Sequence, residues 1–131
     1  MPMNGNSLPI PMTEVAALLR RVIRGEANMV SLVDGLAWHE AYSGNYDFEV
    51  DGWKLTFFND CGELDYVDRA ESPDGRAEDL ESWREVGEGI TEVYWCPLEL
   101  LTDQELCQLE QLMDAIPAAK PTLALLAPPQ G

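Results

Sequence analysis

The dipeptide Asp51-Gly52 constrains the fold more than any other feature of this sequence. Asp-Gly between two segments of alternating polarity is a strong signal for a two-residue β-hairpin turn. Counting outward from this turn gives three apolar cross-strand pairs, which are Val50 with Trp53, Phe48 with Leu55, and Tyr46 with Phe57. Alternate residues of paired strands lie on one face of a sheet. We therefore expect these six side chains to form the apolar face that meets the helices.

The alternation continues after the hairpin, through a second turn at residues 59–62 and a third strand at 63–68. Strand periodicity places every second residue on the same face. In the third strand, Leu64 and Tyr66 are expected to point inward. Glu63, Asp65 and Val67 are expected on the opposite side.

Other segments add to the sheet less clearly. Residues 90–95 predict a fourth strand, which ends at Pro97, and residues 29–33 are compatible with another short strand. Residues 76–84 read as a helical or irregular segment with Leu80 and Trp83 as anchors. The pattern as a whole predicts an antiparallel meander of three to four strands.

Two amphipathic helices flank these strands. In the first, Thr13 can act as the N-cap, Gly25 is a natural end, and apolar residues recur at helical spacing at Val15, Leu18, Leu19, Val22 and Ile23. The second follows a capping box from Thr102 to Glu105 and stops before Pro117. The predicted fold class is α+β, with the meander packed against an N-terminal and a C-terminal helix.

The length of 131 residues fits one domain. We expect a flexible leader at 1–12, a single α+β domain at 13–116 and a Pro-rich tail at 117–131. Four prolines lie in that tail around the apolar run from Leu123 to Ala127. We expect the tail to be mobile or laid across the domain.

Targeting and redox features predict a cytoplasmic protein. The N-terminal residues lack the basic and apolar regions of a secretion signal, and no apolar run approaches the roughly 20 residues of a membrane span. Three cysteines without a CxxC pair argue against a disulfide framework and a structural zinc site. Free thiols suit a reducing compartment.

The net charge of the chain indicates which classes of partner it can bind. There are 24 acidic and 8 basic residues, which gives a net charge of −16. Nucleic acids and anionic membranes would repel such a protein, whereas a basic protein partner would be attracted. The alternative is that the acidity only keeps the protein soluble.

The acidity is concentrated between Asp60 and Glu92, a stretch that contains twelve acidic residues and only three arginines. Carboxylates on a rigid surface can imitate the spaced phosphates of a nucleic acid. Trp83, Tyr94 and Trp95 are either aromatic anchors beside these charges or core residues. The predicted partner-binding residues are Asp60, Glu63, Asp65, Asp68, Glu71, Asp74, Glu78, Asp79, Glu81, Trp83 and Glu85.

Few residues offer catalytic or metal-binding chemistry. A nucleophilic pair of Cys61 and His39 lacks support from spacing, and His39 reads as a half-buried packing residue beside Trp38. The acidic residues do not match an EF-hand loop, and the common nucleotide, zinc-protease and hydrolase motifs are missing from the sequence. The sequence therefore predicts no catalytic, cofactor or metal site, and it leans against an enzyme.

The stretch from Asp51 to Tyr66 reads DGWKLTFFNDCGELDY, and it resembles a family of small bacterial proteins of unknown function. The layout is also similar at the Pro-Asp-Gly turn of residues 73–75 and at the Pro97 to Leu101 step before the last helix. The resemblance covers about Thr13 to Ile116. It implies one compact domain and no particular activity.

These observations favour a non-enzymatic interaction module that antagonises a basic nucleic-acid-binding or toxin partner. Immunity, anti-restriction and anti-CRISPR proteins act in this manner. The alternative is a ligand- or metal-responsive regulatory domain of a bacterial cytoplasmic protein, using the pocket between the sheet and its helices. The oligomeric state stays open.

Overall fold

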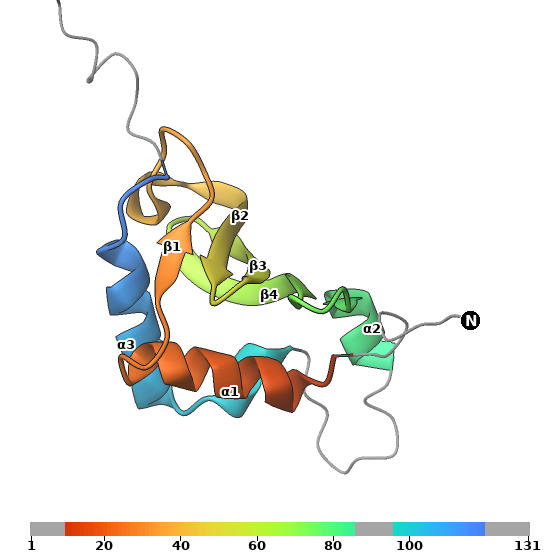
Figure 1. The fold of residues 1–131 in the computed structure, drawn as a ribbon. Helices are drawn as coiled ribbons and strands as arrows, with labels where there is room; N and C mark the ends of the chain where they lie inside the picture. The colour runs from red at the N-terminus through yellow and green to blue at the C-terminus, as the bar shows by residue number, and fades with distance from the viewer. Residues whose placement is uncertain (1–9, 86–95, 120–131) are drawn as a thin grey trace, which may run out of the picture.

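A computed structural model of the chain describes residues 10–85 and 96–119 (Figure 1). The fold is α+β, and the strands form one antiparallel sheet in the order β1-β2-β3-β4-β5. Its strands are β1 (Met29–Ser31), β2 (Ser43–Val50), β3 (Trp53–Asp60), β4 (Glu63–Glu71) and β5 (Ala77–Asp79). Its helices are α1 (Met12–Ile23), α2 (Leu80–Glu85) and α3 (Asp103–Asp114), with short 3-10 helices η2 (Trp38–Glu40) and η3 (Pro97–Leu100).

The hairpin of β2 and β3 has the predicted register. All three predicted cross-strand pairs are present, from Val50 with Trp53 to Tyr46 with Phe57. The two turn residues, Asp51 and Gly52, have φ angles of +49° and +86°, which are the positive values that a tight turn joining twisted strands requires. Trp53 is half-buried, and the other five paired side chains are buried.

Aromatic side chains fill the space beneath this hairpin. Trp38 of η2 packs edge-on against Tyr46 with ring centroids 5.6 Å apart, and Phe48 packs edge-on against Phe57 at 5.7 Å. Such edge-to-face pairs add to the stabilisation from burial itself. Figure 1 shows α1 running below the sheet and α3 at its side, so that the helices and the sheet enclose this core.

Helix α1 buries the predicted apolar stripe but starts earlier than predicted. Val15, Leu19 and Val22 are buried. The N-cap is Pro11, whose side chain makes no capping hydrogen bond, so the prediction of Thr13 as the cap is wrong. Proline is well suited to a helix start because it has no N–H group to satisfy. The packed part of the chain reaches back to Ile10, which is fully buried.

The sheet has five strands, which corrects the prediction of three to four. Residues 29–31 form β1, and the segment expected to be helical or irregular from residue 76 starts as β5 before it becomes α2. Pairing supplies the reason, because Ala77 to Asp79 satisfy their backbone groups along β4. The fourth strand predicted at 90–95 lies outside the described residues.

Strand β4 departs from simple alternation. Its pairing with β3 shifts twice, so that Asp65 and Asp68 have no partner of their own on β3. Each shift is a β-bulge, which inserts one extra residue and turns the following side chains to the other face. Val67 is therefore buried against Phe57, while Tyr66 pairs with Phe58 on the opposite face. The predicted orientations of Tyr66 and Val67 are wrong for this reason.

Polar contacts join the helices at one corner of the molecule. The Arg20 guanidinium on α1 donates to the Glu105 carboxylate at 3.1 Å and to the Leu100 carbonyl at 2.6 Å. Glu105 also completes the predicted capping box, because it accepts from the Thr102 N–H at 2.9 Å. One carboxylate thus caps α3 and holds α1 against it.

The β2–β3 turn and the β3–β4 turn each contain a glycine with positive φ, so the same substitution can be compared at both. We expect both Gly52→Ala and Gly62→Ala to destabilise the protein by about 1 kcal/mol, because each glycine has a φ near +90° that costs an L-residue with a side chain. Gly52→Ala should cost more, since its Cβ would lie 3.2 Å from Pro73 Cγ, whereas Gly62 has open space around it. Urea denaturation measures both effects, and equal or stabilising effects would contradict the turn geometry.

Protonation of Glu105 should weaken the α1–α3 corner. Hydrogen bonds from the Thr102 N–H and from Arg20 hold the pKa of Glu105 below its ordinary value of 4.5. A depressed folded-state pKa adds stability above the unfolded-state value, and this stability is lost as the pH falls through the folded-state value. The stability difference between wild type and Glu105→Gln should therefore be largest at neutral pH and shrink in acid.

The quantity to follow is the difference in stability between the wild type and the Glu105→Gln variant. Acid also relieves repulsion among the excess carboxylates, and it does so in both chains. Thermal unfolding followed from neutral to acidic pH supplies the measurement. A difference that stays constant over this range would mean that the charge of Glu105 has no part in the corner.

Candidate interaction surfaces

Several acidic residues gather at the turn between β3 and β4. Asp60 pairs with Glu63 across the turn, and both carboxylates are exposed together with Asp65. Tyr42 lies beside them, because its carbonyl accepts a hydrogen bond from Gly62 N–H at 3.0 Å, and its side chain is 72% exposed. The end of the sheet therefore presents an exposed aromatic ring next to carboxylates.

The outer face of the sheet extends this group of residues. Phe58 and Tyr66 stack with ring centroids 5.0 Å apart and an interplanar angle of 13°. Burial raises the pKa of Tyr66, and the negative charges of Asp68 and Asp65 raise it further. The two bulge residues thus lie on either side of the tyrosine in sequence and act electrostatically on its hydroxyl group. We call Tyr42, Asp60, Glu63, Asp65 and Asp68 the turn surface.

The carboxylates of the turn surface form no ion pairs in the described part of the chain. Within residues 10–85 and 96–119, none of these four carboxylates forms an ion pair with Lys or Arg. Asp68 accepts a hydrogen bond from the Asn45 amide at 3.4 Å, and its negative charge adds to the rise in the pKa of Arg69 that the hydrogen bond with Glu71 causes. These four acidic residues from the prediction come together as a group.

Three more of the predicted acidic residues have structural contacts instead. Arg69 donates to Glu71 at 2.8 Å and lowers the pKa of that carboxyl. Asp74 accepts from Ser72 and from Arg76, and these contacts lower its pKa too. Asp79 accepts from the Ser82 N–H at 3.0 Å at the start of α2. These carboxylates hold the β4–β5 turn and α2 in place.

The remaining predicted residues are distributed over β5 and α2. Glu78 is half-buried on β5, Glu81 is exposed in the first turn of α2, and Glu85 is the last residue of that helix. Trp83 is only 1% exposed, and its indole N–H donates to the Ile10 carbonyl at 2.8 Å. The structure therefore places Trp83 in the core, where it is not accessible to a partner. Tyr94 and Trp95 lie outside the described residues.

The residues considered for catalysis are on the surface. His39 is exposed in η2, which corrects its interpretation as a half-buried packing residue, and Cys61 is exposed in the β3–β4 turn. No hydrogen bond joins these two side chains in the described part of the chain. Groups of three or more His, Cys, Asp or Glu placed to hold a metal ion are likewise not found among those residues.

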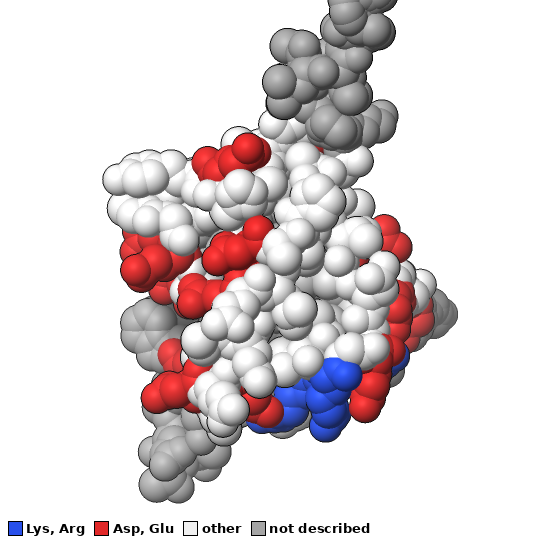
Figure 2. All heavy atoms as spheres, turned by 90° about the vertical axis from the view of Figure 1, so that its left-hand side faces the viewer, with Lys and Arg blue, Asp and Glu red and all other residues white. Residues whose placement is uncertain are grey.

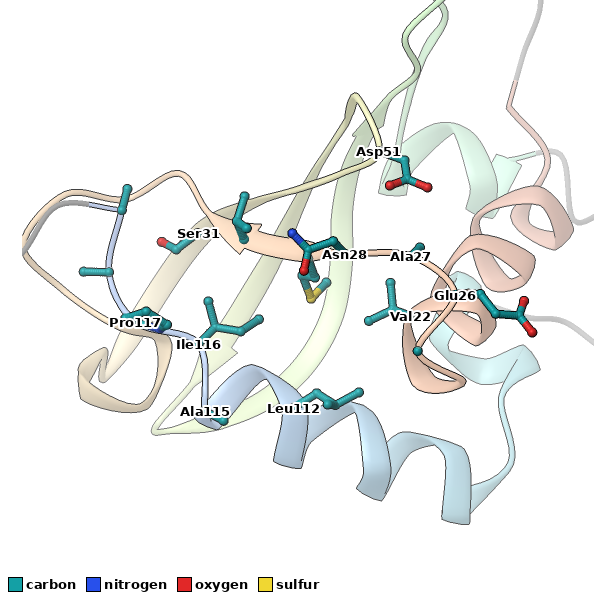
Figure 3. Close-up of a pocket in the computed structure, with 15 residues that line it drawn as sticks. Val22, Glu26, Ala27, Asn28, Ser31, Asp51, Leu112, Ala115, Ile116 and Pro117 are labelled. Carbon is teal, nitrogen blue, oxygen red and sulfur yellow. The ribbon is translucent and has the colours of Figure 1, made fainter.

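A second feature lies on another side of the molecule, a pocket of about 1000 Å³ between the C-terminal ends of α1 and α3 and strand β1 (Figure 3). Val22, Leu112 and Ile116 contribute apolar side chains to it, and Ser31 contributes from β1. Figure 2 shows this side of the molecule, where a broad uncharged area has acidic side chains to its left and right and a group of basic ones below it.

Sequence reasoning missed the exposure of Tyr42 and the outward position of Tyr66, and it named a pocket between the sheet and its helices without the residues that line it. One signal for Tyr66 was present, because apolar residues of β4 recur at a spacing of three, at the half-buried Leu64 and the buried Val67 and Ala70. A regular strand cannot place such residues on one face, so this spacing indicates bulges. The identity of the lining residues has no sequence signal, since they come from segments about 90 residues apart.

The chain belongs to the family described as Domain of unknown function (DUF7693), whose profile matches residues 9–115. No curated protein and no solved structure matches the chain. The expectation of an uncharacterised family is confirmed. That the stretch from Asp51 to Tyr66 marks this family, and that the protein is bacterial, stay predictions. None of the helices in the described residues has the length and apolar character needed to cross a membrane.

The position of Asp68 beside Tyr66 can be tested by titration. We expect Asp68→Asn to lower the pKa of Tyr66 toward its ordinary value, because a negative charge that opposes tyrosinate is removed. The pKa should remain raised in part, since burial is the larger cause. Tyrosinate absorbance measured against pH gives the value, and Tyr66→Phe assigns the transition. Glu49→Gln is the control, and an equal shift in both variants would contradict the local effect.

Proposed function

We propose that this protein is a non-enzymatic interaction module that binds a basic partner protein through the turn surface. The observation that carries the proposal is the contrast among its carboxylates. Those at the turn surface have no cationic partner within the described residues, whereas Glu71 and Asp74 are held by arginines. Carboxylates with uncompensated charge attract a basic surface and accelerate its encounter with the protein.

The turn surface also has the composition of an interface centre. Binding energy concentrates in aromatic side chains that become buried on association, and charged residues around them set specificity. Tyr42 is the exposed aromatic residue beside the acidic turn, and the Phe58–Tyr66 stack gives the neighbouring face a rigid apolar base. Tyr42 takes the anchoring role that the sequence had suggested for Trp83.

The chemistry of the partner follows from these charges. A protein that binds phosphates, such as a nuclease, a repressor or an RNA-guided complex, presents spaced Lys and Arg side chains. Carboxylates held on a β-hairpin can occupy those positions, as in immunity, anti-restriction and anti-CRISPR proteins. The three free thiols suit a reducing compartment, so the cytoplasm is the proposed location.

The alternative function is a ligand- or metal-responsive regulatory domain. The pocket is the observation that favours its ligand-binding form, because it combines apolar lining with a few polar groups. A ligand specific to the folded state would raise the melting temperature.

Two triple variants with the same net charge test the proposed function. The turn variant is Asp60→Asn/Glu63→Gln/Asp65→Asn, and the control is Asp34→Asn/Glu49→Gln/Asp114→Asn, in which all three residues are exposed. The full chain captures its basic partner from the native cytosol, and titration with the isolated partner gives the Kd. We expect the turn variant to weaken binding about tenfold or more, because three attractive charges are lost.

The control separates local recognition from a general charge effect. Binding of the control variant should stay within about twofold of the wild type, and wild-type affinity should fall as salt rises. Tyr42→Ala should also weaken binding about tenfold or more if Tyr42 anchors the interface. Equal weakening by both triple variants, or binding that ignores salt, would refute the turn surface as the binding site.

A further inference from the structure

The two edges of the sheet differ in how their backbone groups are satisfied. On β4, the Leu64 N–H donates to the Glu110 carboxylate of α3 at 2.9 Å, and the Val67 backbone hydrogen-bonds the Cys96 thiol. Side chains therefore protect that edge where β5 does not cover it. Natural sheets need such protection, because an open edge can pair with another strand.

Strand β1 forms the other edge, and its free side opens on the pocket. The Leu32 N–H donates to the Asp47 carbonyl, so in this antiparallel register Val30 exchanges hydrogen bonds with Glu49. The N–H and C=O groups of Met29 and Ser31 then point away from β2. Within the described residues no hydrogen bond to these outward groups is found. The pocket thus has an apolar floor and an open backbone edge.

The rim of the pocket favours an uncharged occupant. Asp51 and Glu26 are its two acidic lining residues, and each has a cationic partner. Arg21 binds Asp51 at 2.8 Å, and Arg24 lies 3.7 Å from Glu26, whose carboxylate points away from the pocket (Figure 3). A basic segment would find no uncompensated charge there. This distinguishes the pocket from the turn surface.

The chain itself approaches the edge from one side. Residues 115–119 line the pocket, and the Ala119 N–H donates to the Val33 carbonyl at 2.8 Å, just beyond β1. The next twelve residues, 120–131, lie outside the described part of the chain. Residues 121–131 carry no charged side chain, and they include the apolar run from Leu123 to Ala127.

We propose that the apolar run from Leu123 to Ala127 docks on the free edge of β1 and covers the pocket. Val33 and Met29 are four positions apart, which is about 13 Å in an extended chain, and five extended residues span about 16 Å. In this arrangement the reversal of direction after Ala119 would fall to Lys120, Pro121 and Thr122. The run would then satisfy the outward groups of Met29 and Ser31 and bury Leu112 and Ile116.

Docking within one chain has a consequence for other occupants. A tethered segment acts at a high effective concentration, so it outcompetes a free strand or ligand of similar intrinsic affinity. The segment would therefore protect the β1 edge, as Glu110 and Cys96 protect β4. Docking at the β1 edge does not depend on a basic partner, because the turn surface is a different part of the molecule.

The test uses the full chain and two double variants. Leu125→Asp/Leu126→Asp charges two adjacent residues, which point to opposite sides of an extended segment, so one of them faces the pocket. Pro129→Asp/Gln130→Asp adds the same two charges outside both the apolar run and the reversal, and it is the control. Hydrogen exchange by NMR reports the Met29 and Ser31 amides, and methyl NOEs report contacts of the leucines with Leu112 and Ile116.

We expect slow exchange of both amides in the wild type and the control, and exchange at least about tenfold faster in the leucine variant. NOEs from Leu123, Leu125 or Leu126 to Ile116 or Leu112 should appear in the wild type at all concentrations. Equal exchange in all three chains without such NOEs would overturn the proposal. Protection that increases with protein concentration would also overturn it, because a second copy would then occupy the edge.

Discussion

The register of the β2–β3 hairpin is the constraint on which the rest of the fold depends. A two-residue turn at Asp51 and Gly52 allows one pairing, and a slip by one residue would move every apolar side chain to the other face. With that pairing, Tyr46, Phe48 and Phe57 meet Trp38 beneath the sheet. The helices then have a single apolar surface to cover.

Strand β4 contributes apolar side chains to the core and acidic side chains to the surface. Its two bulges keep Leu64, Val67 and Ala70 directed toward the core while each bulge adds an aspartate. The acidic turn surface is thus a consequence of the bulges as much as of composition. Because the bulged strand is held by β3 on one side and by α3 on the other, its carboxylates are fixed in space.

The acidic residues divide by their contacts. Some carboxylates cap helices or hold turns, as Glu105, Asp79 and Asp74 do, and the local cations are used there. Others, at the turn surface, form no ion pair with the Lys and Arg residues that the structure describes, so the excess charge is distributed unevenly over this part of the chain. The pocket side has apolar lining and paired charges. A single domain therefore presents two surfaces with different chemistry, one suited to a basic partner and one to an uncharged segment.

The sequence by itself determined the fold class, the hairpin register, the capping box at Thr102 and the location of the acidic stretch. These features depend on residues close together in the chain, where turn geometry and periodicity act directly. Only the tertiary structure decided which carboxylates stay unpaired, that Trp83 is a core residue and Tyr42 an exposed one, and that a pocket lies beside β1. Those outcomes depend on contacts between distant segments, such as Ile10 with Trp83 and Leu64 with Glu110, and the energies of such contacts leave no periodic pattern in the sequence.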